Sequence, residues 1–271
     1  MISFLGLGTM GSPMALNLLK QEGSLLVWNR SPEPQEKLVA AGATGAKDAK
    51  EALGAELSIS MFSNDAAADA VLSPENISPD TVHICMASIS PELARTLTKR
   101  FADAGSKYIS APVLGRPKVA EAGALNILAA GDPSEVSKHE QTLLAMGKRV
   151  WPIGVLPEKA NLVKIAVNYN ILHAIQALAE SVALVEAHNV NGEEFVNILT
   201  NTLFDGAVYK GYGEQVAIRN YNPVFFSMDL GRKDLALAEK SAQEAGIKLP
   251  STDLLAELLN EALQTPALAQ Q

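Results

Sequence analysis

The sequence begins with MISFLGLGTMGSPMALN, residues 1–17, in which a Gly-x-Gly-x-x-Gly pattern lies between a strand-like segment and a helical one. Residues 2–7 are mostly apolar, and from residue 10 onward hydrophobic side chains recur at helical spacing. In this setting Gly6 permits a tight turn, Gly8 lets the backbone approach a pyrophosphate, and Gly11 allows close helix packing. The N–H groups at the positive end of the helix would bind the phosphates. The pattern therefore predicts a dinucleotide site at this glycine loop, residues 6–11, including Thr9 and Met10.

The residues after the second expected strand indicate which dinucleotide binds. The strand at 25–28 is followed by Asn29, Arg30 and Ser31. An acidic side chain in this region accepts a hydrogen bond from the ribose 2′-OH of NAD, whereas an arginine accommodates the 2′-phosphate of NADP. The neutral Asn29 avoids the repulsion of a carboxylate, and Arg30 offers a planar fork of donors. Ser31 before Pro32 is typical of a helix N-cap. We expect NADP(H) as the cofactor.

Length and charge narrow the class of protein. At 271 residues, 48% of them hydrophobic and 5% aromatic, the chain suits one or two helix-rich α/β domains. The formal net charge of -8 leaves no basic stripe to neutralise phosphates, which argues against nucleic acid as a partner. The single cysteine, Cys85, excludes an internal disulfide and lies in the strand-like run VHICM, where packing is its expected role. We expect no metal ion in the site.

The sequence gives no sign of a targeting or membrane segment. The first strand is expected from residue 2, which leaves no room for a signal peptide. We identify no run of about 18 apolar residues that could span a bilayer. The expected protein is cytoplasmic and has no membrane partner.

Strand-like and helical segments alternate over about the first 150 residues. The expected strands are residues 2–7, 25–28, 57–62, 82–86, 108–111 and 126–130, with helices such as 32–41 and 91–102 between them. This alternation predicts a mostly parallel sheet with helices on both faces. After Gly-Val-Leu-Pro at 154–157 the chain is almost entirely helical. The expected fold class is α/β, with a Rossmann dinucleotide-binding domain at 1–157 and an all-α substrate and dimerisation domain, built on a long helix, at 158–271.

The long helix expected at 158–188 contains neither proline nor glycine and is apolar around most of its circumference. A helix of this kind is buried on nearly all sides. Because an isolated small domain could hardly bury it, we expect a homodimer in which this helix packs against the partner subunit.

The same helix carries the best catalytic candidates. Lys164 and Asn168 are four residues apart and lie on one face. A reductase that uses a nicotinamide must protonate the carbonyl oxygen as hydride reaches carbon, and a lysine in a partly dry cleft can do so while Asn168 fixes the substrate. On spacing alone, a polar pair on a helix is more often a solvated or interfacial patch.

Six short motifs are spread along the chain. They are GLGTMG at 6–11, NRS at 29–31, SISP at 88–91, APV at 111–113, Lys164 with Asn168, and KDL at 233–235. The set resembles the β-hydroxyacid dehydrogenase family, which includes 3-hydroxyisobutyrate dehydrogenases, tartronate semialdehyde reductases and glyoxylate or succinic semialdehyde reductases. This family is related to 6-phosphogluconate dehydrogenase.

The resemblance implies a role for each matching residue. Lys164 would be the general acid/base and Asn168 would bind substrate. Ser88 and Ile89 would line the nicotinamide and substrate pocket. Lys233 would close over the cofactor, with Asp234 nearby as a substrate contact. The loop of Met61, Phe62 and Ser63 would contact the cofactor.

One segment departs from the family pattern. Family members that act on simple hydroxyacids usually carry Ser-Gly-Gly after Ala-Pro-Val, whereas this chain has Leu114, Gly115 and Arg116. Leucine cannot donate a hydrogen bond to a substrate carboxylate. Arg116 either recognises a carboxylate or phosphate in another geometry or faces solvent. The glycines usual before the catalytic lysine are also absent, with Glu158 and Ala160 near their places.

Three functions remain open from the sequence. The first is an NADPH-dependent reductase of a small aldehyde or oxo acid, reversible as a β-hydroxyacid dehydrogenase. The second is an imine reductase, which shares the architecture and the Asn-Arg cofactor signature but generally lacks a lysine at the position of Lys164. The third is a non-catalytic NADP-binding sensor or scaffold, which the altered segment at 114–116 permits.

Overall fold

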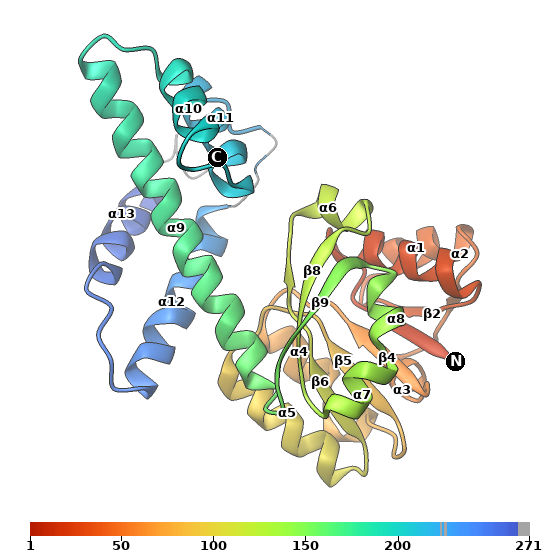
Figure 1. The fold of residues 1–271 in the computed structure, drawn as a ribbon. Helices are drawn as coiled ribbons and strands as arrows, with labels where there is room; N and C mark the ends of the chain where they lie inside the picture. Colours follow the sequence, from red (N-terminus) through yellow and green to blue (C-terminus); the bar gives the residue numbers. More distant parts are fainter. Residues whose placement is uncertain (223, 225–226, 265–271) are drawn as a thin grey trace. The chain divides into compact units, whose positions relative to one another are not determined.

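The computed structural model describes residues 1–222, 224 and 227–264. The chain divides into two compact units, Met1–Lys164 and Ile165–Gln271. The division falls inside one long helix, α9, which runs through Glu158–Ala187 (Figure 1). The expected long helix at 158–188 is therefore confirmed to within one residue.

The first unit contains a nine-stranded sheet in the order β3-β2-β1-β4-β5-β6-β8-β7, with β9 also paired to β8. Its strands are β1 Ile2–Leu5, β2 Leu26–Trp28, β3 Thr44–Gly45, β4 Leu57–Ser60, β5 Val82–Cys85, β6 Lys107–Ser110, β7 Val113–Leu114, β8 Leu125–Ala130 and β9 Gly147–Gly154. Its helices are α1 Gly11–Glu22, α2 Pro32–Ala40, α3 Ala49–Leu53, α4 Asp65–Val71, α5 Pro91–Asp103, α6 Pro117–Glu121, α7 Pro133–Lys138 and α8 Glu140–Leu144, with a 3-10 turn at Pro74–Asn76.

The sheet is parallel from β3 to β6, and β8 runs antiparallel to both β6 and β7. The Rossmann-type α/β fold expected from the sequence is therefore confirmed. Three strands were not expected: β3 and β7 have only two residues each, and β9 pairs parallel to β8 with register shifts that break a regular alternation of burial.

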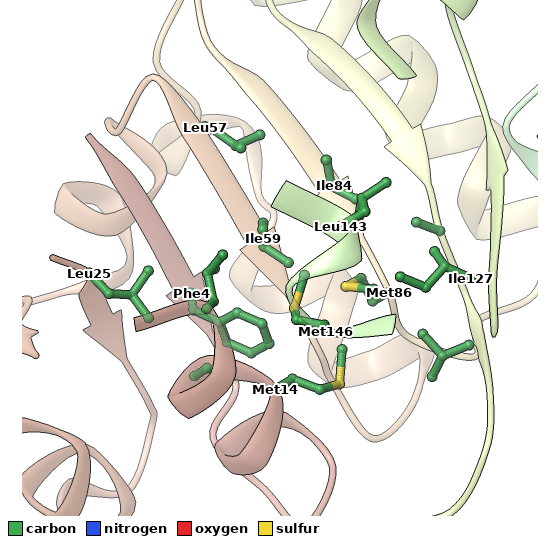
Figure 2. Close-up of a cluster of buried hydrophobic side chains, with 14 of the residues drawn as sticks. Phe4, Met14, Leu25, Leu57, Ile59, Ile84, Met86, Ile127, Leu143 and Met146 are labelled. Atoms are coloured by element: carbon green, nitrogen blue, oxygen red, sulfur yellow. The ribbon is translucent and has the colours of Figure 1, made fainter. Parts of the chain in front are cut away.

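Apolar strand residues supply the cores on the two faces of the sheet. Successive side chains of a strand point to opposite faces, so Phe4 and Leu5 belong to different clusters, as do Ile84 and Cys85. On one face, strand residues pack with α1, α2, α6 and α8, and Figure 2 shows Met14, Leu143 and Met146 against Phe4, Ile59 and Ile84. On the other face they pack with α3, α4 and α5. Cys85 is buried there, which confirms its packing role.

The second unit contains the rest of α9 and the helices α10 Gly192–Asn201, α11 Ala207–Ile218, α12 Met228–Glu244 and α13 Thr252–Gln264 (Figure 1). Leu172 of α9 packs with Leu235 of α12 and Leu255 of α13, and Val182 packs with α10 and α11. His173 bonds through Nε2 to Ser251 Oγ at 2.7 Å and through Nδ1 to the carbonyl of Tyr169 at 2.8 Å. Apolar packing and this polar link therefore attach the other helices to α9.

Helix α9 is less buried within the single chain than expected for a helix of such apolar composition. Only 22% of its most apolar 18-residue window is buried, and Leu184 is 63% exposed. By length and composition alone α9 is a candidate membrane span, so the expectation that no segment meets that test is wrong. The 30 residues of α9 include five charged side chains, at Glu158, Lys159, Lys164, Glu180 and Glu186. The core helix of a soluble protein meets the same test of length and composition.

A histidine of the parallel sheet is buried, with its side chain between the sheet and α5. His83 of β5 bonds to Ser58 Oγ through Nδ1 at 2.7 Å and to Ser60 Oγ through Nε2 at 2.9 Å. Its ring stacks on Phe101 with centroids 5.1 Å apart and near Tyr108 at 6.1 Å. Burial lowers the pKa of His83 to about 3, so the ring is neutral at physiological pH.

We predict that His83 makes the first unit sensitive to acid. Between its ordinary pKa of 6.5 and about 3, the unfolded chain binds a proton that the folded protein does not. The free energy of unfolding should therefore fall as the pH drops below about 6.5, by about 1.4 kcal/mol per pH unit from this residue. Urea unfolding, followed by the fluorescence of Trp28 and Trp151, both in the first unit, measures this free energy.

A substitution isolates the contribution of His83. His83→Asn should be less stable than the wild type at pH 7, and the difference should shrink between pH 7 and pH 5 because the variant lacks the titrating ring. His188→Asn, which removes an exposed histidine, should keep the wild-type pH dependence. Parallel curves for the wild type and His83→Asn would contradict the prediction.

Candidate functional site

The order of the strands reverses at β1. The chain passes from β1 outward to β2 and β3, then returns to the other side of β1 as β4. In open α/β sheets, ligands bind at the carboxyl ends of the strands at such a reversal of order. The loops that leave β1, β4 and β5 all emerge at this carboxyl edge of the sheet because the three strands are parallel neighbours. The predicted cofactor segments at 6–11 and 61–63 are two of these loops.

The glycine loop is folded so tightly that its outer glycines have no room for a side chain. Gly6 has φ +89°, and a Cβ there would lie 2.5 Å from the carbonyl oxygen of Met61. A Cβ on Gly11 would lie 1.9 Å from the carbonyl oxygen of Gly6. At Gly8 a Cβ would meet no heavy atom within 4 Å. The space at Gly8 is therefore open, as the approach of a pyrophosphate requires.

The N-terminus of α1 is suited to an anion. In the described structure no side chain caps this helix, and its first turn holds no acidic residue. Ser12 Oγ instead donates to the carbonyl of Leu7 at 2.7 Å and so braces the loop. Uncapped N–H groups at a helix start carry partial positive charge and bind phosphate. The glycine loop with the start of α1 therefore fits the pyrophosphate of a dinucleotide.

Asn29 connects the second strand to the glycine loop. Its Oδ1 accepts from the N–H of Leu7 at 2.9 Å, and its Nδ2 donates to the carbonyl of Ser31 at 2.9 Å. Gln35 of α2 accepts from the N–H of Asn29 at 3.0 Å. Ser31 occupies the N-cap position of α2, although its side chain makes no capping hydrogen bond. The amide of Asn29 is therefore used to shape the loop.

A pocket of about 560 Å³ lies beside Asn29 and is formed by β2, α2 and the residues after β3. Trp28 and Val39 are among its apolar lining residues, Arg30 and Lys47 are its cations, and Glu36 adds one carboxylate. Apolar walls suit a purine, and two cations suit a phosphate on the ribose. Lys47 was not identified from the sequence because it follows the two-residue strand β3, which has no recognisable pattern.

The loop after β5 is held in place by side chains from two other elements. Ser90 caps α5 by accepting from the N–H of Leu93 at 3.1 Å, and its own N–H donates to Asp65 Oδ1 at 3.0 Å. Asn161 Nδ2 donates to the carbonyl of Ile89 at 3.3 Å. The Ile89 side chain is buried in the apolar cluster that contains residues of α5. The group of Ile89 that contacts Asn161 is therefore its backbone carbonyl. Ser88, with its partly exposed side chain, precedes it in the same loop.

The bond from Asn161 attaches the start of α9 to this edge of the sheet. Lys164 follows three residues later in the same helix, about one turn on. The first unit therefore brings the glycine loop, the loops after β4 and β5 and the helix turn of Lys164 to one edge. Sequence reasoning missed Asn161, because a single asparagine at the start of a helix carries no motif.

The segment that departs from the family pattern is partly a packing element. Leu114 ends β7 and packs in a small apolar cluster with Leu128, Ala160 and Val163, the last two from the first turns of α9. Gly115 has φ +151°, and Arg116 is the N-cap residue of α6. Leu114 thus contacts the helix turn that carries Lys164 through apolar surface.

The second unit pairs two of the predicted site residues. Asn168 Nδ2 donates to Asp234 Oδ2 at 2.7 Å, and both side chains are buried. Only the NH₂ of an amide can donate to a carboxylate, so this bond fixes the orientation of Asn168. Lys233 is the preceding residue on α12 and is partly exposed. Lys164 and Asn168 lie four residues apart on α9, and therefore on one face of it.

Comparison with known proteins agrees with this geometry. Residues 1–154 match the family model described as the NAD binding domain of 6-phosphogluconate dehydrogenase, and residues 159–270 match the NAD-binding domain of NADP-dependent 3-hydroxyisobutyrate dehydrogenase. An uncharacterized oxidoreductase of Bacillus subtilis, YfjR, is 33% identical over 93% of this chain and 90% of its own length. Glyoxylate/succinic semialdehyde reductase 1 of Arabidopsis thaliana is 28% identical over 97% and 91%.

A solved structure shows the same fold over nearly the whole chain. The 3-hydroxyisobutyrate dehydrogenase of Mycobacterium tuberculosis, determined with L-serine, superposes with a TM-score of 0.87 at 24% identity, covering 97% of this chain and 93% of that one. A Rossmann domain followed by a helical domain, with the glycine loop at the reversal of strand order, defines an NAD(P)-dependent oxidoreductase. The chain belongs to the β-hydroxyacid dehydrogenase family.

We predict opposite effects for two single-methyl substitutions in the glycine loop. Gly8→Ala should fold with wild-type stability but lose at least about tenfold in NADPH affinity, about 1.4 kcal/mol, because its methyl occupies the open space. Gly11→Ala should lower the free energy of unfolding by about 1–3 kcal/mol, because its methyl meets backbone. Thermal unfolding and fluorescence titration with NADPH measure the two effects. A destabilised Gly8→Ala that binds NADPH normally would contradict this assignment.

Proposed function

We propose that the protein is an NADPH-dependent reductase of a small aldehyde or oxo acid, reversible as a β-hydroxyacid dehydrogenase, with Lys164 as general acid/base. The observation that supports this most directly is the contact of Asn161 with the Ile89 carbonyl. It holds the helix turn of Lys164 at the same sheet edge as the glycine loop. The relatives named above are oxidoreductases, one of them a reductase of glyoxylate and succinic semialdehyde.

Most of the proposed cofactor-binding residues belong to the first unit. The glycine loop and the start of α1 would hold the pyrophosphate, Trp28 and Val39 would contact the adenine, and Arg30 with Lys47 would bind the 2′-phosphate. The loop at 61–63 would lie along the cofactor, with Ser88 near the nicotinamide and Lys233 as a further contact. The bound cofactor supplies the hydride.

The protein's own chemistry in the reaction is proton transfer and positioning. Lys164 would give a proton from its ammonium to the carbonyl oxygen of the substrate as the carbon is reduced, and the neutral amine then regains a proton from solvent. Asn168, oriented by Asp234, would hold the substrate. In the oxidising direction the amine of Lys164 would take the hydroxyl proton.

A substrate screen separates this function from the alternatives. NADPH consumption should be measured with glyoxylate, succinic semialdehyde and other small aldehydes and oxo acids, and with a cyclic imine. Reduction of an aldehyde or oxo acid supports the proposal. Turnover of the imine alone would indicate an imine reductase, against which the presence of Lys164 already argues. NADPH binding without turnover of any compound would indicate a sensor or scaffold.

We propose a cytoplasmic homodimer, and the exposed apolar surface of α9 supports the dimer. Leu184 of α9, Ile198 of α10 and Ile218 of α11 are each more than 40% exposed in the single chain. A contiguous patch of exposed apolar side chains marks an interaction site. A second copy of the chain is the occupant we propose, because a helix apolar on nearly all sides needs more cover than one small domain gives.

We predict that the wild type binds NADPH more tightly than NADH. Arg30→Ala should lose roughly 1.5 to 3 kcal/mol of that preference, the scale of a hydrogen bond to a charged group. Lys50→Ala removes a nearby exposed charge that does not line the pocket, and it should leave the preference unchanged. Fluorescence titration of each variant with both cofactors provides the measurement. Equal affinity of the wild type for the two would overturn the cofactor assignment.

We predict that Lys164→Ala lowers kcat by roughly 10²- to 10⁴-fold, the usual range for a positioned acid or base. NADPH affinity should barely change, because the phosphates are bound elsewhere. Asn168→Ala should mainly raise KM if Asn168 holds the ground state and transition state alike. Lys159→Ala, an exposed lysine of the same helix, is the control for loss of charge. Near-normal turnover by Lys164→Ala would be incompatible with the mechanism.

We predict that the protein is an obligate dimer that buries well over about 2,000 Å². Light scattering should give twice the chain mass of 28.7 kDa at micromolar concentration. Leu184→Arg should weaken the dimer, because it places a charge in an apolar interface. A stable wild-type monomer at that concentration would remove the argument from α9.

A further inference from the structure

Asn161 is the most deeply buried polar side chain on α9. It is the fourth residue of the helix and is 1% exposed. Its Nδ2 donates to the carbonyl of Ile89. Because a carbonyl accepts only from the NH₂ of an amide, this bond also fixes the direction of Asn161 Oδ1.

Asn161 Oδ1 is buried without a hydrogen-bond partner in the described part of the chain. Buried polar atoms without a partner are few in native proteins, and a buried carbonyl oxygen is costly to leave unpaired. The oxygen can only accept, so the group that satisfies it in the working enzyme must carry an N–H or O–H. The neighbouring Ala160, Leu128 and Val163 form an apolar cluster and offer no side-chain donor.

The nearest side-chain cation along the helix on this face is Lys164. Residues three apart on a helix are neighbours on one face. Long helical side chains also lean back toward the N-terminus and cover the preceding turn. In such a rotamer the ammonium of Lys164 reaches back over the turn that contains Asn161.

We propose that Asn161 is a positioning residue for Lys164: its Oδ1 accepts one hydrogen bond from the Lys164 ammonium while its Nδ2 holds the loop after β5. This inference rests on the proposed role of Lys164 as general acid. An oxygen that only accepts favours the charged ammonium, because a hydrogen bond from a charged donor is stronger. It also takes up only one of the three ammonium protons, so that another can go to the substrate carbonyl.

The arrangement links proton delivery to the cofactor side of the candidate site. Through Asn161, the general acid is connected to the backbone of Ile89, in the loop next to the expected nicotinamide position. A shift of that loop would move the acceptor and with it the ammonium. Asn161 would thus set the reach of Lys164 without touching the substrate.

Two variants separate the role of Asn161 Oδ1 as an acceptor from the role of Nδ2 as a donor to the Ile89 carbonyl. Asn161→Leu has a similar shape and neither donates nor accepts, whereas Asn161→Asp keeps an acceptor and loses the donor to Ile89. We expect Asn161→Leu to lower kcat about 10- to 100-fold, the scale of a hydrogen bond to a charged group. Asn161→Asp should retain kcat within about threefold. Asn170→Ala, which changes an exposed asparagine of the same helix, should have wild-type kcat.

A double-mutant cycle tests whether Asn161 acts through Lys164. The kcat of Asn161→Leu, Lys164→Ala and the double variant should be measured with NADPH and the aldehyde or oxo acid of highest kcat/KM in the screen above. Thermal unfolding checks that each variant folds. We expect the loss from Asn161→Leu to fall below about twofold once Lys164 is alanine, with the dissociation constant of NADPH unchanged in every variant.

Each other result has a distinct meaning. Equal losses from Asn161→Leu in both backgrounds, or an Asn161→Asp variant as slow as Asn161→Leu, would overturn the inference and leave the proposed function intact. Weaker NADPH binding in the Asn161 variants would also overturn it, because the acceptor would then serve the carboxamide of the nicotinamide. Wild-type turnover by Lys164→Ala would refute the proposed function, and this inference with it.

Discussion

The approach of Gly11 to the carbonyl oxygen of Gly6 is the constraint on which the candidate site depends. With only 1.9 Å between that oxygen and the position of a Cβ, the chain must turn from β1 into α1 without any side chain at residue 11. The turn sets the start of α1 at the carboxyl end of β1, directly beside β4. The Met61 carbonyl then limits Gly6 from the other side. One packed turn therefore fixes the positions of a helix dipole and two loops.

Much of the first unit could be predicted because its parallel strands are buried on both faces and read as short apolar runs. The strands β1, β4 and β5 were predicted from such runs, with ends displaced by one or two residues. The helices α2 and α5 were predicted between the strands, each with its end displaced by one residue. The strand β9 could not be predicted, because most of its side chains are at least partly exposed and its register shifts twice. The antiparallel β7 has only two residues and depends entirely on its pairing with β8.

Residues of the candidate site could be predicted where they belong to a local sequence motif whose residue types have a known physical role. The glycines at 6, 8 and 11 and the pair Asn29–Arg30 are of this kind. Asn161 and Lys47 could not be predicted, because each matters through a neighbour distant in sequence: the Ile89 carbonyl for one and the pocket beside β2 for the other. Leu114 shows the reverse case. Its departure from the family pattern is visible in the sequence, but its packing with Ala160 of α9 is visible only in the structure.

The hydrogen bonds of Asn29 have a consequence for redesign of the cofactor preference. A carboxylate at residue 29 is the obvious way to recruit the ribose hydroxyls of NADH. It would keep an acceptor for the Leu7 N–H but lose the donor to the Ser31 carbonyl, two contacts that the amide now makes together. That exchange would alter the electrostatics and the conformation of the loop in one step. Changes at Arg30 and Lys47, whose side chains are exposed at the pocket rim, offer an engineer the less disruptive starting point.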